Sequence, residues 1–168
     1  MTRIGGLKTV AVLSCFLALA ACSKKNTPDL DAGAGGLGGG GAGMAAPGSK
    51  ADFQTNVGDR IYFIVDQSTL TPEASDTLAR QAQWLVRYPN VTVQVEGHSD
   101  ERGTREYNIS LSARRATAAR NFLIQQGVPG SRISSIAYGK ERPAALCDAE
   151  ECWSQNRRAV TVITGGTQ

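Results

Sequence analysis

A stretch dominated by Gly and Ala divides the chain into two unequal parts. Residues 31–49 contain the run Gly38–Gly41 and several further Gly and Ala residues, which leave too few large apolar side chains to build a core. Gly-rich segments of this kind behave as flexible coils. The stretch is therefore expected to be a linker. Residues 53–168 remain for a folded domain, which is enough for one hydrophobic core but marginal for two.

The N-terminus has the pattern of a secretory signal. Arg3 and Lys8 form a positively charged start, and the apolar run 9–20 that follows is too short to span a bilayer. Small residues precede Cys22. The sequence therefore predicts a signal peptide over residues 1–21 that is absent from the mature chain.

The residues around the expected cleavage point resemble a bacterial lipobox, Leu19-Ala20-Ala21-Cys22. The resemblance implies lipidation of Cys22, with a diacylglyceryl group on its sulfur and an acyl chain such as palmitate on its amine. Several chains acting together give stable anchoring. Ser23 stands where enteric lipoproteins retained at the inner membrane have Asp, so outer-membrane sorting is implied. The alternative is that Cys22 is a structural thiol behind a plain signal peptide.

The cysteines indicate an oxidising compartment. Once Cys15 leaves with the signal peptide and Cys22 is lipidated, Cys147 and Cys152 remain, and we expect them to form a disulfide if their Cα atoms lie within about 7 Å. Zinc is the rival interpretation. Two Cys and one distant His are too few ligands for a structural zinc site, so no metal or cofactor is expected.

The charge of the mature chain excludes two classes of partner. Removing Arg3 and Lys8 from the formal charge of +3 leaves +1 (3 − 2 = 1). A nearly neutral chain lacks the basic surface that nucleic acids or anionic lipid surfaces attract. We therefore expect no nucleic-acid partner.

Periodicity in residues 53–168 predicts an α+β fold. Thr71-Pro72-Glu73 has the pattern of a helix start, and that helix should end before Pro89. A second helix is predicted over 107–126, with an apolar stripe that includes Ala116 and Leu123. The predicted fold is a sandwich in which two main helices pack on one face of a mixed four-stranded sheet, with strands near 61–65, 91–96, 133–138 and 159–164.

The segment between the second predicted strand and the second helix has the spacing of a ligand clamp. Asp100 follows the strand that ends at Gly97, and Asn108 and Arg115 lie seven residues apart on the helix. At about 100° per residue they fall within about 20° of one face. A carboxylate and a guanidinium on one rigid scaffold, open to solvent, suit a ligand with an ammonium and a carboxylate of its own.

Each clamp residue also has a structural interpretation. Asp100 could accept backbone N–H groups as a turn or helix cap. Arg115 could belong to a solvated helix face, although its neighbours three and four residues away, Leu111, Ser112, Ala118 and Ala119, include no carboxylate that could pair with it. Spacing alone leaves both interpretations open.

Several motifs together resemble the OmpA-like peptidoglycan-binding domain. They are Gly97-His98-Ser99-Asp100, then Asn108, then the block from Leu111 to Ala116. The local sequence around Asp100 resembles that of the peptidoglycan-associated lipoproteins of Gram-negative bacteria even more closely. Further matches are Tyr-Gly-Lys-Glu-Arg-Pro at 138–143 and Asn-Arg-Arg-Ala-Val at 156–160, so the resemblance covers about residues 57–164.

The resemblance implies roles for five residues. In the family, the Asp after the Gly-His pair and the second Arg of the Leu-Ser-x-x-Arg-Ala block grip meso-diaminopimelate of the peptidoglycan stem peptide, and these positions are Asp100 and Arg115 here. Asn108 stands at the family's Asn position, where it could bond peptide amides. Asp66 matches an Asp at the end of the first strand, and Arg158 matches an Arg near the last strand.

The family also implies a function and partners. The resemblance implies a tether between outer membrane and peptidoglycan, made of a lipid anchor, a long linker and a wall-binding domain. The closer resemblance to peptidoglycan-associated lipoproteins implies the Tol–Pal system, with TolB as partner. One alternative is an OmpA-domain outer-membrane lipoprotein outside that system. The other is a peptidoglycan hydrolase with His98, the only histidine, as its base. The chain lacks a recognisable nucleophile motif, so we expect His98 to be a hydrogen-bonded structural residue and the protein to be no enzyme.

Overall fold

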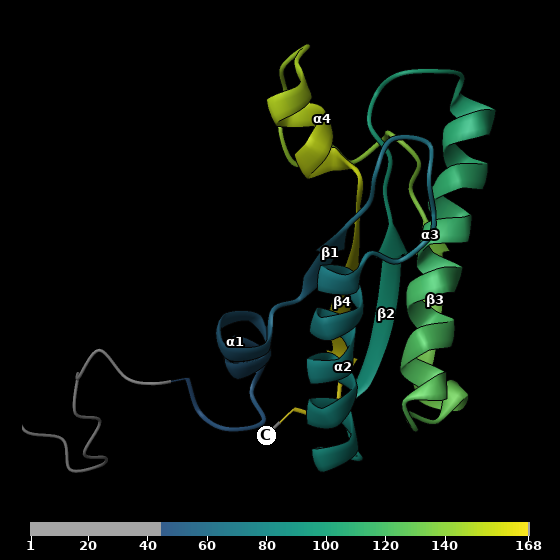
Figure 1. Cartoon of the computed structure of the whole chain (residues 1–168). Helices are drawn as coiled ribbons and strands as arrows, with labels where there is room; N and C mark the ends of the chain where they lie inside the picture. The colour runs from purple at the N-terminus through teal and green to yellow at the C-terminus, as the bar shows by residue number, and fades with distance from the viewer. Residues whose placement is uncertain (1–44, 168) are drawn as a thin grey trace, which may run out of the picture. The chain divides into compact units, whose positions relative to one another are not determined.

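The computed structural model describes residues 45–167, which form one compact unit built around a four-stranded sheet (Figure 1). The expected signal peptide, Cys22 and the linker up to residue 44 lie outside the described residues. The strand order is β1-β4-β2-β3. The strands β2 and β3 run parallel, whereas β4 is antiparallel to both β1 and β2, which makes the sheet mixed as predicted. The strands span Arg60–Tyr62 (β1), Thr92–Gly97 (β2), Ile133–Ala137 (β3) and Arg158–Gly165 (β4).

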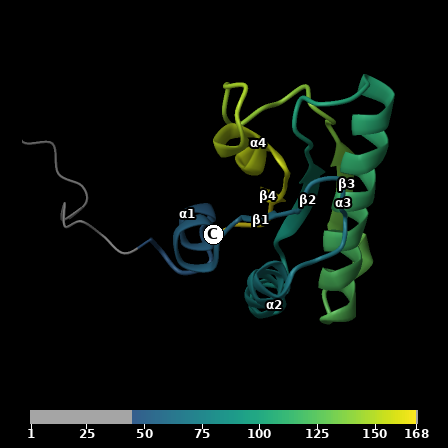
Figure 2. The same ribbon diagram turned by 45° about the horizontal axis from the view of Figure 1, so that its top comes forward.

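Two helices cover one face of this sheet, α2 (Pro72–Arg87) and α3 (Arg105–Gln125), and α3 packs on β2 and β3 (Figures 1 and 2). Each begins at a threonine that accepts a backbone N–H: Thr71 from Ala74 and Thr104 from Tyr107. Such N-caps satisfy donors that the first turn leaves unpaired. The predicted α+β sandwich is therefore confirmed, with helix ends within two residues of those expected.

The core lies between the helices and the sheet. It combines Leu78 and Leu85 of α2 with Val93 and Val95 of β2 and Leu123 of α3, all at most 1% exposed. Gly97 lets α3 approach the end of β2 closely, because a Cβ there would lie 1.9 Å from the main-chain oxygen of Ser112. The N-terminal part of α3 is thereby held against the strand that leads to Asp100.

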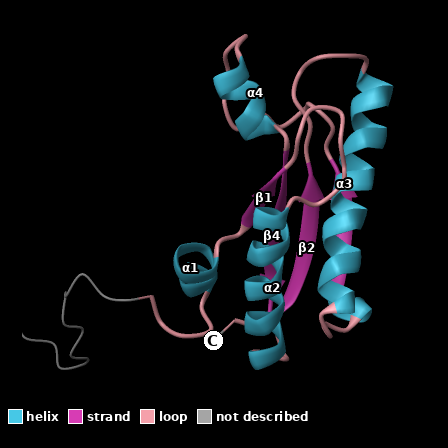
Figure 3. Ribbon diagram, in the orientation of Figure 1, coloured by secondary structure: helices cyan, strands magenta, loops and turns pink. Residues whose placement is uncertain are grey.

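The structure adds short elements that periodicity did not predict (Figure 3). The folded unit reaches back before residue 53, since Ser49 caps a short helix and Asp52 accepts a hydrogen bond from Trp84 Nε1 at 2.8 Å. The described residues contain no helix that is both long and apolar enough to cross a membrane. The additional elements are α1 (Lys50–Asp52), the π-helix η1 (Phe53–Val57), the 3-10 helix η2 (Gly130–Arg132) and α4 (Glu150–Asn156).

Candidate peptide-binding site

Asp100 lies three residues beyond β2, at the end of the sheet where α3 begins. Its side chain is buried and accepts from two arginines. Oδ1 receives the backbone N–H and Nε of Arg102 at 3.2 and 3.3 Å, while Oδ2 receives Nη2 of Arg102 at 2.5 Å and Nη1 of Arg157 at 3.3 Å. A carboxylate has about four acceptor sites. All of them are therefore occupied within the fold, and the expectation of a carboxylate open to solvent is wrong.

Arg115 lies on the inner face of α3, and the expectation of a free guanidinium open to solvent is wrong. The side chain is 0% exposed. Its three nitrogens donate to the main-chain oxygens of Gln67 at 2.9 Å, His98 at 2.9 Å and Ile64 at 3.2 Å. The acceptors come from the loop after β1 and from the end of β2. The sequence could not indicate them because they are backbone groups of distant segments.

Asn108 shares that inner face, as the seven-residue spacing predicted, and is 1% exposed. Its Nδ2 donates to the main-chain oxygen of Arg102 at 2.7 Å, which fixes the loop that carries Asp100. Asp66 lies in the exposed loop after β1, at a positive φ of 56°, and accepts from Tyr107 Oη at 3.2 Å. A non-Gly residue with positive φ is uncommon and is found at turns and functional sites.

Arg158 is the predicted residue that the structure does not bring to the others. It is the first residue of β4, and the Nη2 of its buried side chain donates to the main-chain oxygen of Arg142 at 3.2 Å. The preceding residue, Arg157, lies between α4 and β4 and contacts Asp100 instead. It also donates Nε to the main-chain oxygen of Phe63 at 3.2 Å.

Three arginines, Arg102, Arg115 and Arg157, and two carboxylates, Asp66 and Asp100, determine the electrostatics of this region. Burial lowers the pKa of Arg115 to about 10, and the Asp100 carboxylate opposes that shift, so Arg115 stays charged at neutral pH. Burial raises the pKa of Asp100, but hydrogen bonds from Arg102 outweigh burial and hold that pKa below its usual value. Asp66 also stabilises the charged form of Arg115. The acid and the base are thus ionised and coupled.

His98 is buried at 2% exposure beside Tyr138, with ring centroids 5.5 Å apart. The expectation of a hydrogen-bonded ring is wrong: among residues 45–167 neither ring nitrogen has a partner within hydrogen-bond distance, and the carboxylate of Glu96 lies 3.7 Å from Nε2. The main-chain oxygen of His98 instead receives Arg115. Burial, together with the charges of Arg158 and Arg142, lowers the pKa of His98 to about 4, so the ring is neutral at neutral pH.

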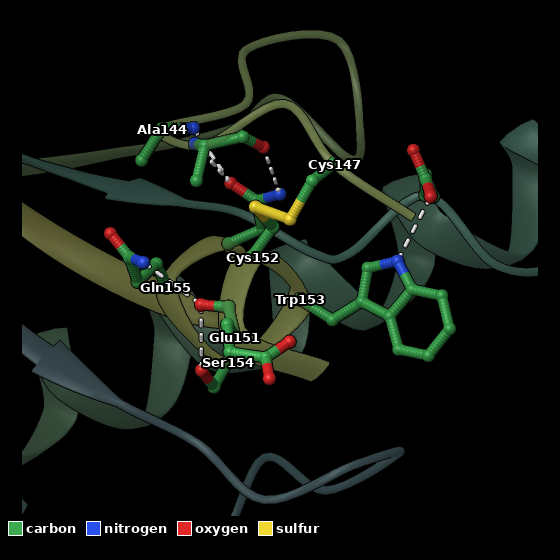
Figure 4. Close-up of a disulfide and its surroundings, with 10 residues drawn as sticks. Ala144, Cys147, Glu151, Cys152, Trp153, Ser154 and Gln155 are labelled. Atoms are coloured by element: carbon green, nitrogen blue, oxygen red, sulfur yellow. Dashed lines mark hydrogen bonds between the residues drawn. A yellow bond between two sulfur atoms is a disulfide. The ribbon is translucent and has the colours of Figure 1, made fainter. Parts of the chain in front are cut away.

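Sequence reasoning missed the residues that surround Asp100, namely Arg102, Arg157 and Trp153. The guanidinium of Arg102 stacks 4.2 Å from the centroid of the Trp153 ring. Trp153 belongs to α4, beside a disulfide that joins Cys147 and Cys152 (Figure 4). The only sequence signal for these residues was the position of Trp153, directly after Cys152 of the expected disulfide. Within the described part of the chain, no cluster of three or more His, Cys, Asp or Glu side chains could hold a metal ion.

Comparisons with known proteins place this arrangement in a family. The sequence profile of the OmpA family matches residues 62–157. The chain is 57% identical to a peptidoglycan-associated lipoprotein of Agrobacterium fabrum over 98% of this chain and 92% of the relative. It is 59% identical to one of Rhizobium meliloti, with the same shares covered.

Solved structures agree with the sequence relatives. The crystal structure of the peptidoglycan-associated lipoprotein from Burkholderia pseudomallei has a TM-score of 0.62 and 37% identity, and the match covers 63% of this chain and 90% of that one. The C-terminal domain of Helicobacter pylori MotB has a TM-score of 0.60 and 25% identity, with 64% and 84% covered.

The profile match and the identities establish that the chain belongs to the OmpA family and, within it, to the peptidoglycan-associated lipoproteins. It is accordingly a cell-envelope lipoprotein and not an enzyme. The hydrolase alternative, with His98 as a base, is thereby removed. The buried and neutral His98 ring is consistent with this conclusion.

Proposed function

We propose that the protein binds peptidoglycan through the diaminopimelate of the stem peptide and tethers the outer membrane to the cell wall. The observation that carries the proposal is the placement of two charged groups, Asp100 and Arg115, at one end of the sheet, where Arg115 donates to the main-chain oxygen of His98, two residues before Asp100. Diaminopimelate ends in an ammonium and a carboxylate. Each would find a partner of opposite charge, and such charge-assisted hydrogen bonds are the strong ones.

The groups of the fold that contact Asp100 and Arg115 resemble the two ends of diaminopimelate. The Arg102 guanidinium donates to Asp100 where a ligand ammonium would bind. The Arg102 side chain is 40% exposed, so it has room to leave Asp100. The main-chain oxygens of Ile64 and Gln67 accept hydrogen bonds from Arg115 where a ligand carboxylate would bind. Both residues belong to the exposed loop after β1. We infer that diaminopimelate displaces these internal partners, with Asp66 and Asn108 lining the same region.

Co-sedimentation of the protein with purified sacculi tests the proposal. Wild type should sediment with sacculi without releasing muropeptides. Asp100→Asn, which keeps the shape but removes the charge, should lose binding. Sacculi with Lys as the third stem residue should bind more weakly, because Lys lacks the distal carboxylate that Arg115 would hold. Equal binding to both kinds of sacculus would exclude diaminopimelate as the recognised group.

The matched control for Asp100 is Asp76, an exposed carboxylate of α2 with no side-chain hydrogen bond among the described residues. Asp76→Asn changes the net charge equally and should leave sedimentation unchanged. A loss of binding in both variants would mean that overall charge, and not the Asp100 site, attracts the wall.

The partners and the location follow as part of the same proposal. We propose that Cys22 is lipidated after removal of residues 1–21, that the residues between Cys22 and the folded unit act as linker, and that the folded unit, which begins before residue 53, faces the periplasm from the outer membrane. Membership of the Tol–Pal system, with roles in envelope integrity and cell division, is supported by the similarity to peptidoglycan-associated lipoproteins. A TolB pull-down decides between this assignment and an OmpA-domain lipoprotein outside the system.

A further inference from the structure

The segment from Pro143 to Arg157, called the α4 loop below, is cross-linked within itself. The disulfide joins Cys147 to Cys152 with their Cα atoms 5.6 Å apart. Asn156 joins the end of α4 to the start of the loop, because its Oδ1 accepts hydrogen bonds from the backbone N–H groups of Ala144 and Ala145 at 2.7 and 3.1 Å. Figure 4 shows the disulfide on one side of α4 and Trp153 pointing away from it. The loop therefore presents a fixed set of side chains.

Two of those side chains contact the loop that carries Asp100. Trp153 donates Nε1 to Glu101 Oε1 at 2.9 Å, and its ring lies under the Arg102 guanidinium at 4.2 Å. Arg157 donates Nη1 to Asp100 at 3.3 Å. Every residue from Asp100 to Arg102 thus has a partner in or beside α4.

Glu150 completes this set by pairing with Arg157 Nη2. Arg157 is buried, so its charge would otherwise act on Asp100 without compensation. With Glu150 in place, Arg157 can orient the carboxylate while much of its charge is balanced. Asp100 then keeps its attraction for a second cation, whether Arg102 or a ligand ammonium.

We propose that the α4 loop, held by its disulfide, is a positioning element of the peptidoglycan site, in which Arg157 orients Asp100 and Trp153 holds Arg102. The inference rests on the proposed function and goes beyond it by assigning roles to Trp153, Glu150 and the Cys147–Cys152 bond. When a ligand ammonium displaces Arg102, Arg157 keeps the carboxylate in place and the Trp153 ring keeps Arg102 beside it. The site should therefore weaken when the disulfide is reduced.

The test uses the chain from Ser23 onward, without lipid, because every core residue lies between Phe53 and Ile163. Its only cysteines are Cys147 and Cys152, so a reductant acts on one bond. Sacculus binding and the Asp100 titration, followed by the carboxyl carbon resonance in NMR, are measured with the disulfide intact, reduced, and replaced in Cys147→Ser/Cys152→Ser. The charged or titratable groups around Asp100 are Arg102, Arg157, Glu150, Arg115, Asp66 and Tyr107.

Loss of the disulfide should weaken sacculus binding about tenfold, equivalent to one charge-assisted contact. The Asp100 titration midpoint should also rise, because Arg157 and Arg102 would hold the carboxylate less firmly. A loop that only covers the end of the sheet would leave this midpoint unchanged. An unchanged midpoint together with unchanged binding overturns the proposal.

Variants with the disulfide intact test the same idea if the cysteine variant fails to fold. Trp153→Leu and Glu150→Gln should each weaken binding, whereas Trp153→Phe, which keeps an aromatic ring under Arg102, should restore most of it. The matched control is Leu146→Ala, since Leu146 is 86% exposed and immediately precedes Cys147 in the same α4 loop. Equal binding by Trp153→Leu and Leu146→Ala contradicts a positioning role for the tryptophan.

The two proposals fail in different ways. If wild type with its disulfide intact does not bind sacculi, the proposed function is wrong, and the titration of Asp100 still reports whether α4 positions it. If wild type binds and the reduced protein binds equally with the same Asp100 midpoint, the function stands and the role of the α4 loop is refuted.

Discussion

Two arginines at opposite ends of the sheet have the same hydrogen-bonding role but different surroundings. Arg115 donates to three main-chain oxygens at the end where β2 finishes. Arg132 donates to the main-chain oxygens of Leu85, Tyr88 and Val91 at 2.8 to 2.9 Å, at the end where β2 starts. Both arginines therefore tie loops to the sheet.

The difference between the two arginines lies in the charges near them. Burial alone lowers the pKa of Arg132, whereas Asp100 and Asp66 act on Arg115 as well. A guanidinium held only by carbonyls is a structural tie. The same group coupled to a carboxylate is also able to take part in binding a zwitterion. The comparison teaches that the coupled acid, and not the buried arginine itself, distinguishes the two ends.

Arg115→Ala should have the largest effect on stability. The substitution removes a side chain that is 0% exposed and leaves three main-chain oxygens without this donor, one of them in a buried hydrogen bond. We expect a loss of about 3–5 kcal/mol in the free energy of unfolding. Urea denaturation measures it. Arg115→Lys keeps the charge but loses the planar fork, so it should recover only part of the stability. A loss below about 1 kcal/mol for Arg115→Ala would contradict the observed hydrogen bonds.

Acidification should affect the Arg115 end through His98, the chain's only histidine. Its pKa of about 4 in the folded protein lies below the ordinary histidine pKa of about 6.5, so the unfolded chain binds the proton more readily. This contribution is fully present above about pH 6.5 and is lost as the pH falls toward 4, by about 3 kcal/mol at most. Urea unfolding between pH 7.5 and 4.5 should show the decline, and His98→Gln should reduce it. An equal decline in that variant would assign the effect to carboxylates.

Arg132→Ala is the structural counterpart of Arg115→Ala. Arg132 is only partly buried, so water can reach the released carbonyls, and we expect a loss of about 2 kcal/mol by urea denaturation. Sacculus binding per folded molecule should stay at the wild-type level. Weaker sacculus binding by this variant would mean that hydrogen bonds from arginine to loops at either end of the sheet affect binding. Arg115 and Arg132 would then not differ in function.

The sheet and its two helices could be predicted because their signals are local. Val91, Val93 and Val95 alternate with polar residues, and Thr71 with Pro72 marks a helix start. These patterns depend on neighbours a few residues away. The elements they predicted all appear in the structure, although strand order required the coordinates.

The site was predicted less completely because its contacts are long-range and polar. Apolar periodicity could not show that Asn108 and Arg115 point inward, since it assigns polar residues to the solvent face. The start of β4 decided which of Arg157 and Arg158 faces Asp100, and sequence-based boundaries are uncertain by more than one residue. Only the structure could resolve that choice.

The ends of α3 offer the smallest and most closely matched test of the comparison. Thr104 caps the helix at the Asp100 end, and Gly127, with φ of 96°, follows it at the Arg132 end. Thr104→Ala removes a cap and Gly127→Ala places a Cβ at positive φ, and each should destabilise the protein by about 1 kcal/mol. Only Thr104→Ala should also weaken sacculus binding, because the start of α3 carries Asn108 and with it the loop of Asp100. Equal binding by the two variants, at equal stability, would show that the site tolerates fraying of the helix that carries it.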